Sequence, residues 1–157
     1  MSLASPKATA INGAAFKIGI AAARFNEALV DSLLSRVQAT LRAAGVKAKN
    51  ITVVRVPGSH EVPWAAHQLA KRGGRDGVIA LGVLIGGDTN HHEMVGLSVS
   101  NALQGIAVTT GVPVINGVIV TDSLAQAKAR TTGKINRGAE FAHAALAMAA
   151  LKKGGVR

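Results

Sequence analysis

The chain has 157 residues, of which 48% are hydrophobic and 17% are charged, so it suits one domain with a sizeable core and excludes extensive disorder. It contains no cysteine, which excludes disulfides and thiolate metal sites. Its 18 basic and 8 acidic residues give a net charge of +10, yet no Lys or Arg occurs between Asp76 and Ala127 and aromatic residues are scarce, which argues against a base-reading nucleic-acid module.

The first half of the chain predicts two strand–helix units behind a loose tail, residues 1–15. Short apolar or β-branched runs predict buried strands over residues 16–23 and 51–56. Apolar residues at helical spacing predict a first helix between Asn26, a candidate N-cap, and Gly45, a candidate terminator. A second helix is expected through Trp64, ending at the glycines 73–74.

The second half predicts two more strands, over residues 76–84 and 114–120. Between them a long helix begins near His91, with apolar residues expected on one side: Met94, Val95, Ala102, Leu103 and Ile106. Two further helices, 123–131 and 137–153, flank a break at Gly133.

This alternation predicts an α/β fold, in which residues 16–157 form a single domain. We expect a three-layer α/β/α sandwich with a central four-stranded, mostly parallel sheet of the flavodoxin-like kind. Ligands of such sheets gather at the carboxyl ends of the strands. The polar and aromatic candidates that follow the first three strands should therefore meet at one edge.

The segment from Gly82 to Val95 has the pattern of an active site: an apolar strand, a double glycine, Asp88-Thr89, two histidines and a helix start. Glycines allow close approach of the backbone to a ligand, and the N–H groups that open a helix can bind phosphate. His91 is suited to carry protons near neutral pH. Two adjacent histidines with Asp88 could also suggest a metal, but no His-x-x-x-His spacing supports zinc, so we expect no metal.

These residues resemble the 6,7-dimethyl-8-ribityllumazine synthase family of riboflavin biosynthesis, whose segment is typically Gly-x-Val-Ile-Arg-Gly-Glu-Thr-Pro-His-Phe-Asp-Tyr-Val. Matching positions in this chain are Gly82, Gly87, Thr89, His91 and Val95, with Asp88 and Glu93 as acidic equivalents. Other family patterns recur in the same order: Arg24-Phe25-Asn26, the run 56–63, and the segments 126–130 and 136–140, which carry Arg130 and Arg137. The resemblance extends from about Phe16 to Leu151.

The resemblance implies a condensation of 5-amino-6-(D-ribitylamino)uracil with 3,4-dihydroxy-2-butanone 4-phosphate, the penultimate step of riboflavin synthesis, with no cofactor. His91 would then be catalytic. The pyrimidine substrate would be bound by Phe25, Ser59, His60, Glu61, Val83, Leu84, Ile85 and Asn116. The phosphate would be bound by Gly87, Asp88, Thr89, Arg130 and Arg137. By position alone Phe25 could equally be a core residue, and Arg130 and Arg137 could be solvated helix charges.

Departures from the family pattern keep an alternative function open. Gly86 stands where the family commonly has arginine, Asn90 replaces proline, and His92 and Met94 replace aromatic residues. Asn116 stands in place of a phenylalanine that closes the neighbour's pocket in the family. The alternative is a non-catalytic flavin- or pyrimidine-binding homologue, or a shell-forming one. We expect His92 to point away from the site, since adjacent helical residues lie roughly 100° apart.

The expected partners are small-molecule substrates and further copies of the chain. Family members form pentamers, some of which pack into icosahedral capsids, and the site is shared between neighbouring subunits. We interpret the surplus positive charge as a basic surface that attracts phosphorylated substrates, with no dedicated nucleic-acid partner. No apolar run has membrane-spanning length and no secretory signal opens the chain, so we expect a cytoplasmic protein without a membrane partner.

Overall fold

In the computed structural model, which describes residues 10–155, a parallel sheet lies between two layers of helices. The four strands run in the order β2-β1-β3-β4, and all three neighbouring pairs are parallel. Their bounds are β1 Ile18–Ala23, β2 Ile51–Val56, β3 Gly77–Ile85 and β4 Val114–Thr121. The fold is the expected three-layer α/β/α sandwich of the flavodoxin-like kind.

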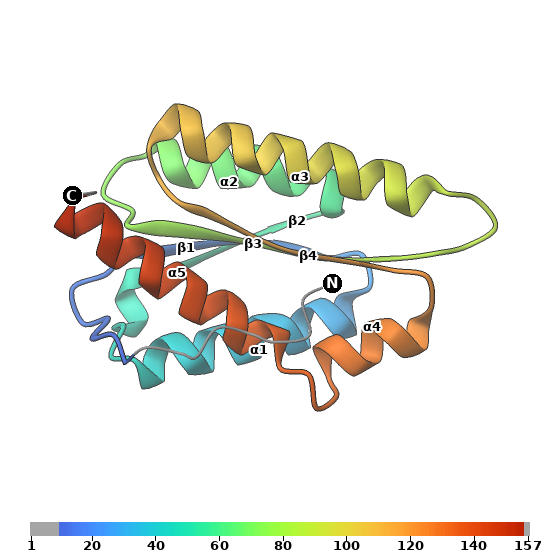
Figure 1. Cartoon of the computed structure of the whole chain (residues 1–157), viewed down its shortest axis with the longest axis horizontal. Coiled ribbons are helices and arrows are strands. Elements are labelled where there is room, and N and C mark those ends of the chain that lie inside the picture. The colour runs from blue at the N-terminus through green and yellow to red at the C-terminus, as the bar shows by residue number, and fades with distance from the viewer. Residues whose placement is uncertain (1–9, 156–157) are drawn as a thin grey trace.

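Three helices cover one face of the sheet and two cover the other (Figure 1). The first group comprises α1 Glu27–Ala43, α4 Leu124–Thr131 and α5 Arg137–Gly154. The second comprises α2 Val62–Lys71 and α3 His91–Thr110. Two short 3-10 turns, Ala48–Asn50 and Ser59–Glu61, precede β2 and α2. None of the helices within residues 10–155 is both long enough and apolar enough to cross a membrane.

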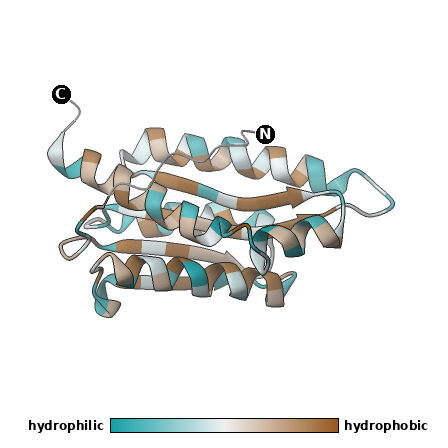
Figure 2. Ribbon diagram, turned by 60° about the horizontal axis from the view of Figure 1, so that its bottom comes forward, coloured by the Kyte–Doolittle hydropathy of each residue, from teal (hydrophilic) through white to brown (hydrophobic). Residues whose placement is uncertain are grey.

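Two hydrophobic clusters, one on each face, hold the layers together. The central strands β1 and β3 are almost wholly buried because helices cover both of their faces. Figure 2 shows strands that are mostly apolar between helices of mixed polarity. The larger cluster packs α1 and α5 against the sheet, around fully buried side chains such as Ile20, Leu33 and Leu146. The smaller packs α2 and α3 through Leu69, Val99 and other buried residues. These layers fix the strand ends that carry the candidate residues.

Asn26 stands before α1 as predicted, but its side chain does not cap the helix. Its backbone is left-handed, with φ 57° and ψ 44°. In this conformation the amide Nδ2 donates a hydrogen bond to the carbonyl oxygen of Val83 at 2.8 Å. Asn26 therefore ties the end of β1 to β3, and the predicted capping role of its side chain is wrong.

The predicted apolar side of α3 is only partly correct. Val99 and Leu103 are its buried residues, and Val95 and Ile106 pack partly buried beside them. Met94 and Ala102, expected on this side, are exposed, as are Leu97 and Val108. Because α3 is apolar on more than one side, periodicity did not identify the side that faces the sheet.

Candidate active site

The largest concentration of predicted site residues lies in a pocket of about 380 Å³ at the carboxyl ends of β1, β2 and β3. This volume is within the range of small-molecule sites. The pocket lies where the strand order turns from β2-β1 to β3-β4, the usual position of ligand sites in open parallel sheets. Its lining comprises Phe25, Asn26, Gly58, Ser59, His60, Glu61, Val83, Leu84, Ile85, Gly87, Thr89, His91, His92 and Val95.

Phe25 provides the aromatic wall of this pocket. It follows β1 directly, and its backbone N–H donates to the carbonyl oxygen of Pro57 at 3.0 Å. Its side chain is 74% exposed, which rules out the alternative that it is a core residue. An exposed ring held at the mouth of a pocket can stack on a planar ligand.

Ser59 lies buried behind the pocket and is packed closely against β3. A Cβ atom built on Gly82 would lie only 2.4 Å from the Ser59 hydroxyl oxygen, so a larger residue at position 82 would displace the Ser59 side chain. Within residues 10–155 this hydroxyl has no hydrogen-bond partner although it is buried. Leaving such a group without a partner costs free energy, and a bound polar ligand would remove that cost.

Glu61 is held at the pocket rim by the turn that precedes α2. Its Oε2 accepts a hydrogen bond from the backbone N–H of Gly58 at 2.8 Å. Its Oε1 lies 4.0 Å from Nδ1 of His60. A carboxylate oriented in this way keeps further lone pairs available for hydroxyl groups of a ligand.

The N-terminus of α3 opens directly onto the pocket. His91 is its first residue, and its side chain is exposed at the pocket. The first N–H groups of a helix have no acceptor within the helix, so this end can receive an anionic group beside the imidazole. Gly87 and Thr89, in the preceding loop, complete this part of the lining.

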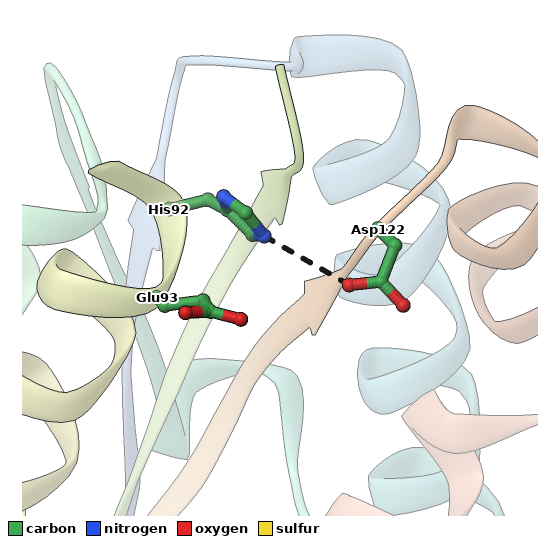
Figure 3. A group of neighbouring side chains, drawn as sticks. All are labelled: His92, Glu93 and Asp122. Atoms are coloured by element: carbon green, nitrogen blue, oxygen red, sulfur yellow. Dashed lines mark ion pairs between the residues drawn. The ribbon is translucent and has the colours of Figure 1, made fainter. Parts of the chain in front are cut away.

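His92 also lines the pocket, so the expectation that it points away is wrong. Its side chain is only 12% exposed, and within the described part of the chain neither ring nitrogen has a hydrogen-bond partner. The nearest carboxylate oxygen is Oδ1 of Asp122, 3.9 Å from Nε2 (Figure 3). The pocket is bordered by His91, His92 and Val95 of α3, so two adjacent helical residues both reach it.

His92, Glu93 and Asp122 also form the group of described residues that could hold a metal ion. Their ligand atoms lie within 4.8 Å of one another. Ligands of a tetrahedral zinc ion lie about 2.1 Å from the metal and hence about 3.4 Å apart, so the group would have to contract around an ion. Both carboxylates are exposed and are therefore already hydrated. This geometry alone assigns no metal role to the group.

Four predicted site residues do not line the pocket of a single chain. Asp88 is exposed in the loop before α3. Asn116, in β4, lies opposite Ala80, which is five residues before the pocket end of β3. Its Oδ1 accepts a hydrogen bond from the N–H of Val118. Arg130 donates to the carbonyl oxygen of Gln126 at 3.0 Å, and Arg137 pairs with Glu140 at 2.5 Å. The pocket of one chain thus contains no Lys or Arg among its described lining residues.

The pocket is also lined by residues that were not predicted there from the sequence: Asn26, Gly58, His92 and Val95. The signal for Asn26 and Gly58 was available, because both lie directly at the carboxyl end of a predicted strand. Val95 was interpreted only as a helix residue that packs against the sheet. It lies one helical turn beyond His91, at a spacing that places both on one side of α3.

Comparison with known proteins shows what this chain is similar to over most of its length. Residues 15–153 match the family model described as 6,7-dimethyl-8-ribityllumazine synthase. A curated protein of that name from Leuconostoc mesenteroides subsp. mesenteroides is 39% identical over 137 residues, which cover 87% of this chain and 88% of the relative.

Proposed function

This chain belongs to the 6,7-dimethyl-8-ribityllumazine synthase family, and we propose that the pocket at the carboxyl ends of β1, β2 and β3 is its active site. The enzyme condenses 5-amino-6-(D-ribitylamino)uracil with 3,4-dihydroxy-2-butanone 4-phosphate. The products are 6,7-dimethyl-8-ribityllumazine, phosphate and water. The observation that carries the assignment is the convergence of Phe25, Ser59, Glu61 and His91 on one pocket from three strand ends.

The pyrimidine partner is proposed to bind between Phe25 and the end of β3, with its ring stacked on the phenyl group. Backbone groups of Val83, Leu84 and Ile85 and the buried hydroxyl of Ser59 would receive the polar edge of the ring. Glu61, already oriented by Gly58, would accept hydrogen bonds from the ribityl hydroxyls. His60 would contribute its backbone.

The phosphorylated partner is proposed to bind at the opening of α3. Gly87, Asp88 and Thr89 would surround the phosphate, and the helix N-terminus would favour its negative charge. His91 would move protons as the imine forms, the phosphate leaves and the ring closes. Holding two reactants together supplies much of the rate enhancement, as effective molarities of well-oriented reactions show.

The assignment is tested by incubating the purified protein with both substrates and following lumazine absorbance against the spontaneous reaction. His91→Ala is expected to slow turnover about a hundredfold, the usual range for loss of a general acid–base group. His60→Ala, at an exposed side chain of the same rim, is the matched control and should keep its rate. Product no faster than the spontaneous background would favour the alternative of a binding homologue without catalysis.

We further propose that the site is completed by a second copy of the chain, in a homopentamer or a multiple of it. A phosphate monoester carries about two negative charges, and the pocket of one chain offers it no cationic side chain among its described lining. Arg130, Arg137 and Asn116 would come from the neighbour. The exposed apolar residues Trp64, Leu97 and Val108 provide surface for such contacts.

A mixed assembly tests this sharing directly. His91→Ala and Arg130→Ala chains should each be nearly inactive alone. When they are coexpressed, about a quarter of the shared pockets would combine an intact His91 with an intact Arg130, so activity should reappear. If both residues acted within one chain, no pocket would be restored. Light scattering on the wild-type protein gives the number of copies, and a monomer would contradict the proposal.

We also propose a cytoplasmic location, because a charged sugar phosphate does not cross a membrane unaided. Cell fractionation with an antibody to the chain tests this location.

A further inference from the structure

The surplus positive charge lies almost entirely at the end of the molecule opposite the pocket. Nine basic residues lie where strands begin and helices end, on the left of Figure 1, and we call this set the basic edge. Its members are Lys17, Arg42, Lys47, Lys49, Lys71, Arg72, Arg75, Lys152 and Lys153. The one acidic residue there is Asp76. The rest of residues 10–155 contains seven basic and seven acidic residues, so the formal charge of that part is zero.

The side chains of the basic edge are largely unengaged. Lys153 is the exception, because its Nζ donates to the carbonyl oxygen of Ala15 at 2.9 Å and lies 3.7 Å from Oδ1 of Asp76. Asp76 itself is buried, and its Oδ2 accepts from the backbone N–H of Lys17 at 2.7 Å. No side chain of the other eight basic-edge residues pairs with another residue in the range 10–155.

Basic residues elsewhere are mostly used within the fold. Arg55 forms ion pairs with Asp31 and Glu27, and Arg36 donates to two carbonyl oxygens in the 132–133 turn. Arg130 and Arg137 are engaged as described above. Four of the seven described basic residues outside the basic edge thus hold the fold together, whereas eight of the nine in the basic edge are left for solvent or a partner.

Attraction of substrates, the interpretation made from the sequence, does not explain this placement. The two ends of β3 are separated by eight residue steps of about 3.3 Å, hence about 26 Å. The Debye length at physiological ionic strength is about 8 Å, so charges at the far end are strongly screened at the pocket. Complementing the helix dipoles explains part of the set, since Arg42, Lys71 and Lys152 lie in last turns. It does not explain Lys17, Lys47 or Arg75, which lie outside the α-helices.

We propose that the basic edge binds the phosphate backbone of nucleic acid without reading its sequence. Unpaired, exposed lysines and arginines are the groups that neutralise backbone phosphates and release their counterions. Stacking on bases is not expected, because the chain has only four aromatic residues and none of them is exposed on this edge: Phe25 and Trp64 are the exposed ones, at the pocket rim and early in α2. Several copies in one assembly would strengthen the binding by multivalency.

The experiment is a fluorescence-anisotropy titration of a labelled, random-sequence DNA duplex at several salt concentrations. The logarithm of the association constant should fall linearly with that of the salt concentration, with a slope of about −0.9 for each phosphate contact. Lys47→Gln with Lys49→Gln should weaken binding about tenfold at low salt and reduce the slope by about two. Unlabelled duplexes of unrelated sequence should compete equally.

The matched control is Lys128→Gln with Lys134→Gln, which removes the same charge from the balanced part of the chain. Its affinity should stay within about twofold of the wild type. Lumazine formation should be unchanged in both double variants, so a failed enzymatic assignment would not be mistaken for a failed binding surface. Equal weakening by both pairs, no salt-dependent DNA binding, or binding only to phosphatidylserine vesicles would each overturn the proposal.

Discussion

Gly86 stands where the lumazine synthase family commonly has arginine, and we expect any side chain at this position to destabilise the fold. The substitution Gly86→Ala, which adds a single methyl group, tests this expectation. A Cβ atom at this position would lie 2.8 Å from the backbone oxygen of Asp122 and 3.1 Å from its Cα. The loop cannot easily move away, because the N–H of Gly86 donates to the carbonyl oxygen of Thr121 at 2.7 Å. Any side chain at position 86 therefore meets the backbone that follows β4.

The loss of folding stability in Gly86→Ala can be estimated from this contact. Ordinary van der Waals contacts of a Cβ begin near 3.4 Å, so one of the two segments has to shift by about 0.6 Å. Forcing an extra carbon into a packed site costs about 1–3 kcal/mol. At about 3 °C per kcal/mol for a chain of this length, Gly86→Ala should lower Tm by about 6 °C.

The assay is thermal unfolding followed by circular dichroism at one protein concentration. Gly87→Ala is the matched control, because a Cβ there meets nothing within 4 Å and the residue has no positive φ. Its Tm should lie within about 2 °C of the wild type. Equal unfolding temperatures of the two variants would refute the predicted clash with Asp122. The same clash predicts that Gly86→Arg, which introduces the residue common in the family, destabilises this chain.

Three further substitutions test how the pocket and the core are held, each by urea unfolding. Asn26→Ala loses the hydrogen bond to Val83 and places alanine in a left-handed conformation, which should lower the free energy of unfolding by about 2 kcal/mol. An unchanged free energy of unfolding would contradict the role of Asn26 in holding β1 to β3. Leu33→Ala leaves a cavity under α1, where the side chain is fully buried, and should cost about 3 kcal/mol, with Leu34→Ala costing less because that side chain is only partly buried. Asp76→Asn weakens the acceptor for the backbone N–H of Lys17 and should lower the free energy of unfolding by about 1–2 kcal/mol. An unchanged free energy of unfolding would show that this hydrogen bond does not stabilise the fold.

The strands and the convergence of most site residues could be predicted from the sequence because each rests on a local signal. The central strands are uninterrupted apolar runs, and β2 begins and ends at the predicted residues, Ile51 and Val56. Parallel connection then requires the segments after β1, β2 and β3 to meet at one edge. Phe25, Ser59 and His91 were found in this way.

What the sequence did not predict depends on three-dimensional placement. The orientation of His92 depends on how far the pocket extends over α3, which helical periodicity alone does not specify. The side chain of Asn26 has two possible uses, and the left-handed backbone selects the bond to Val83 instead of a cap. Net charge is a sum over the chain, so it predicts a basic surface without indicating at which end of the strands that surface lies.

The separation of the basic edge from the pocket gives the molecule a strong electric dipole along its strands. A cation-exchange bead or another anionic support should therefore capture the protein in one orientation, with the strand beginnings against the support. The mouth between Phe25 and His91 would then face the bulk liquid, so an adsorbed layer should remain open to incoming reactants.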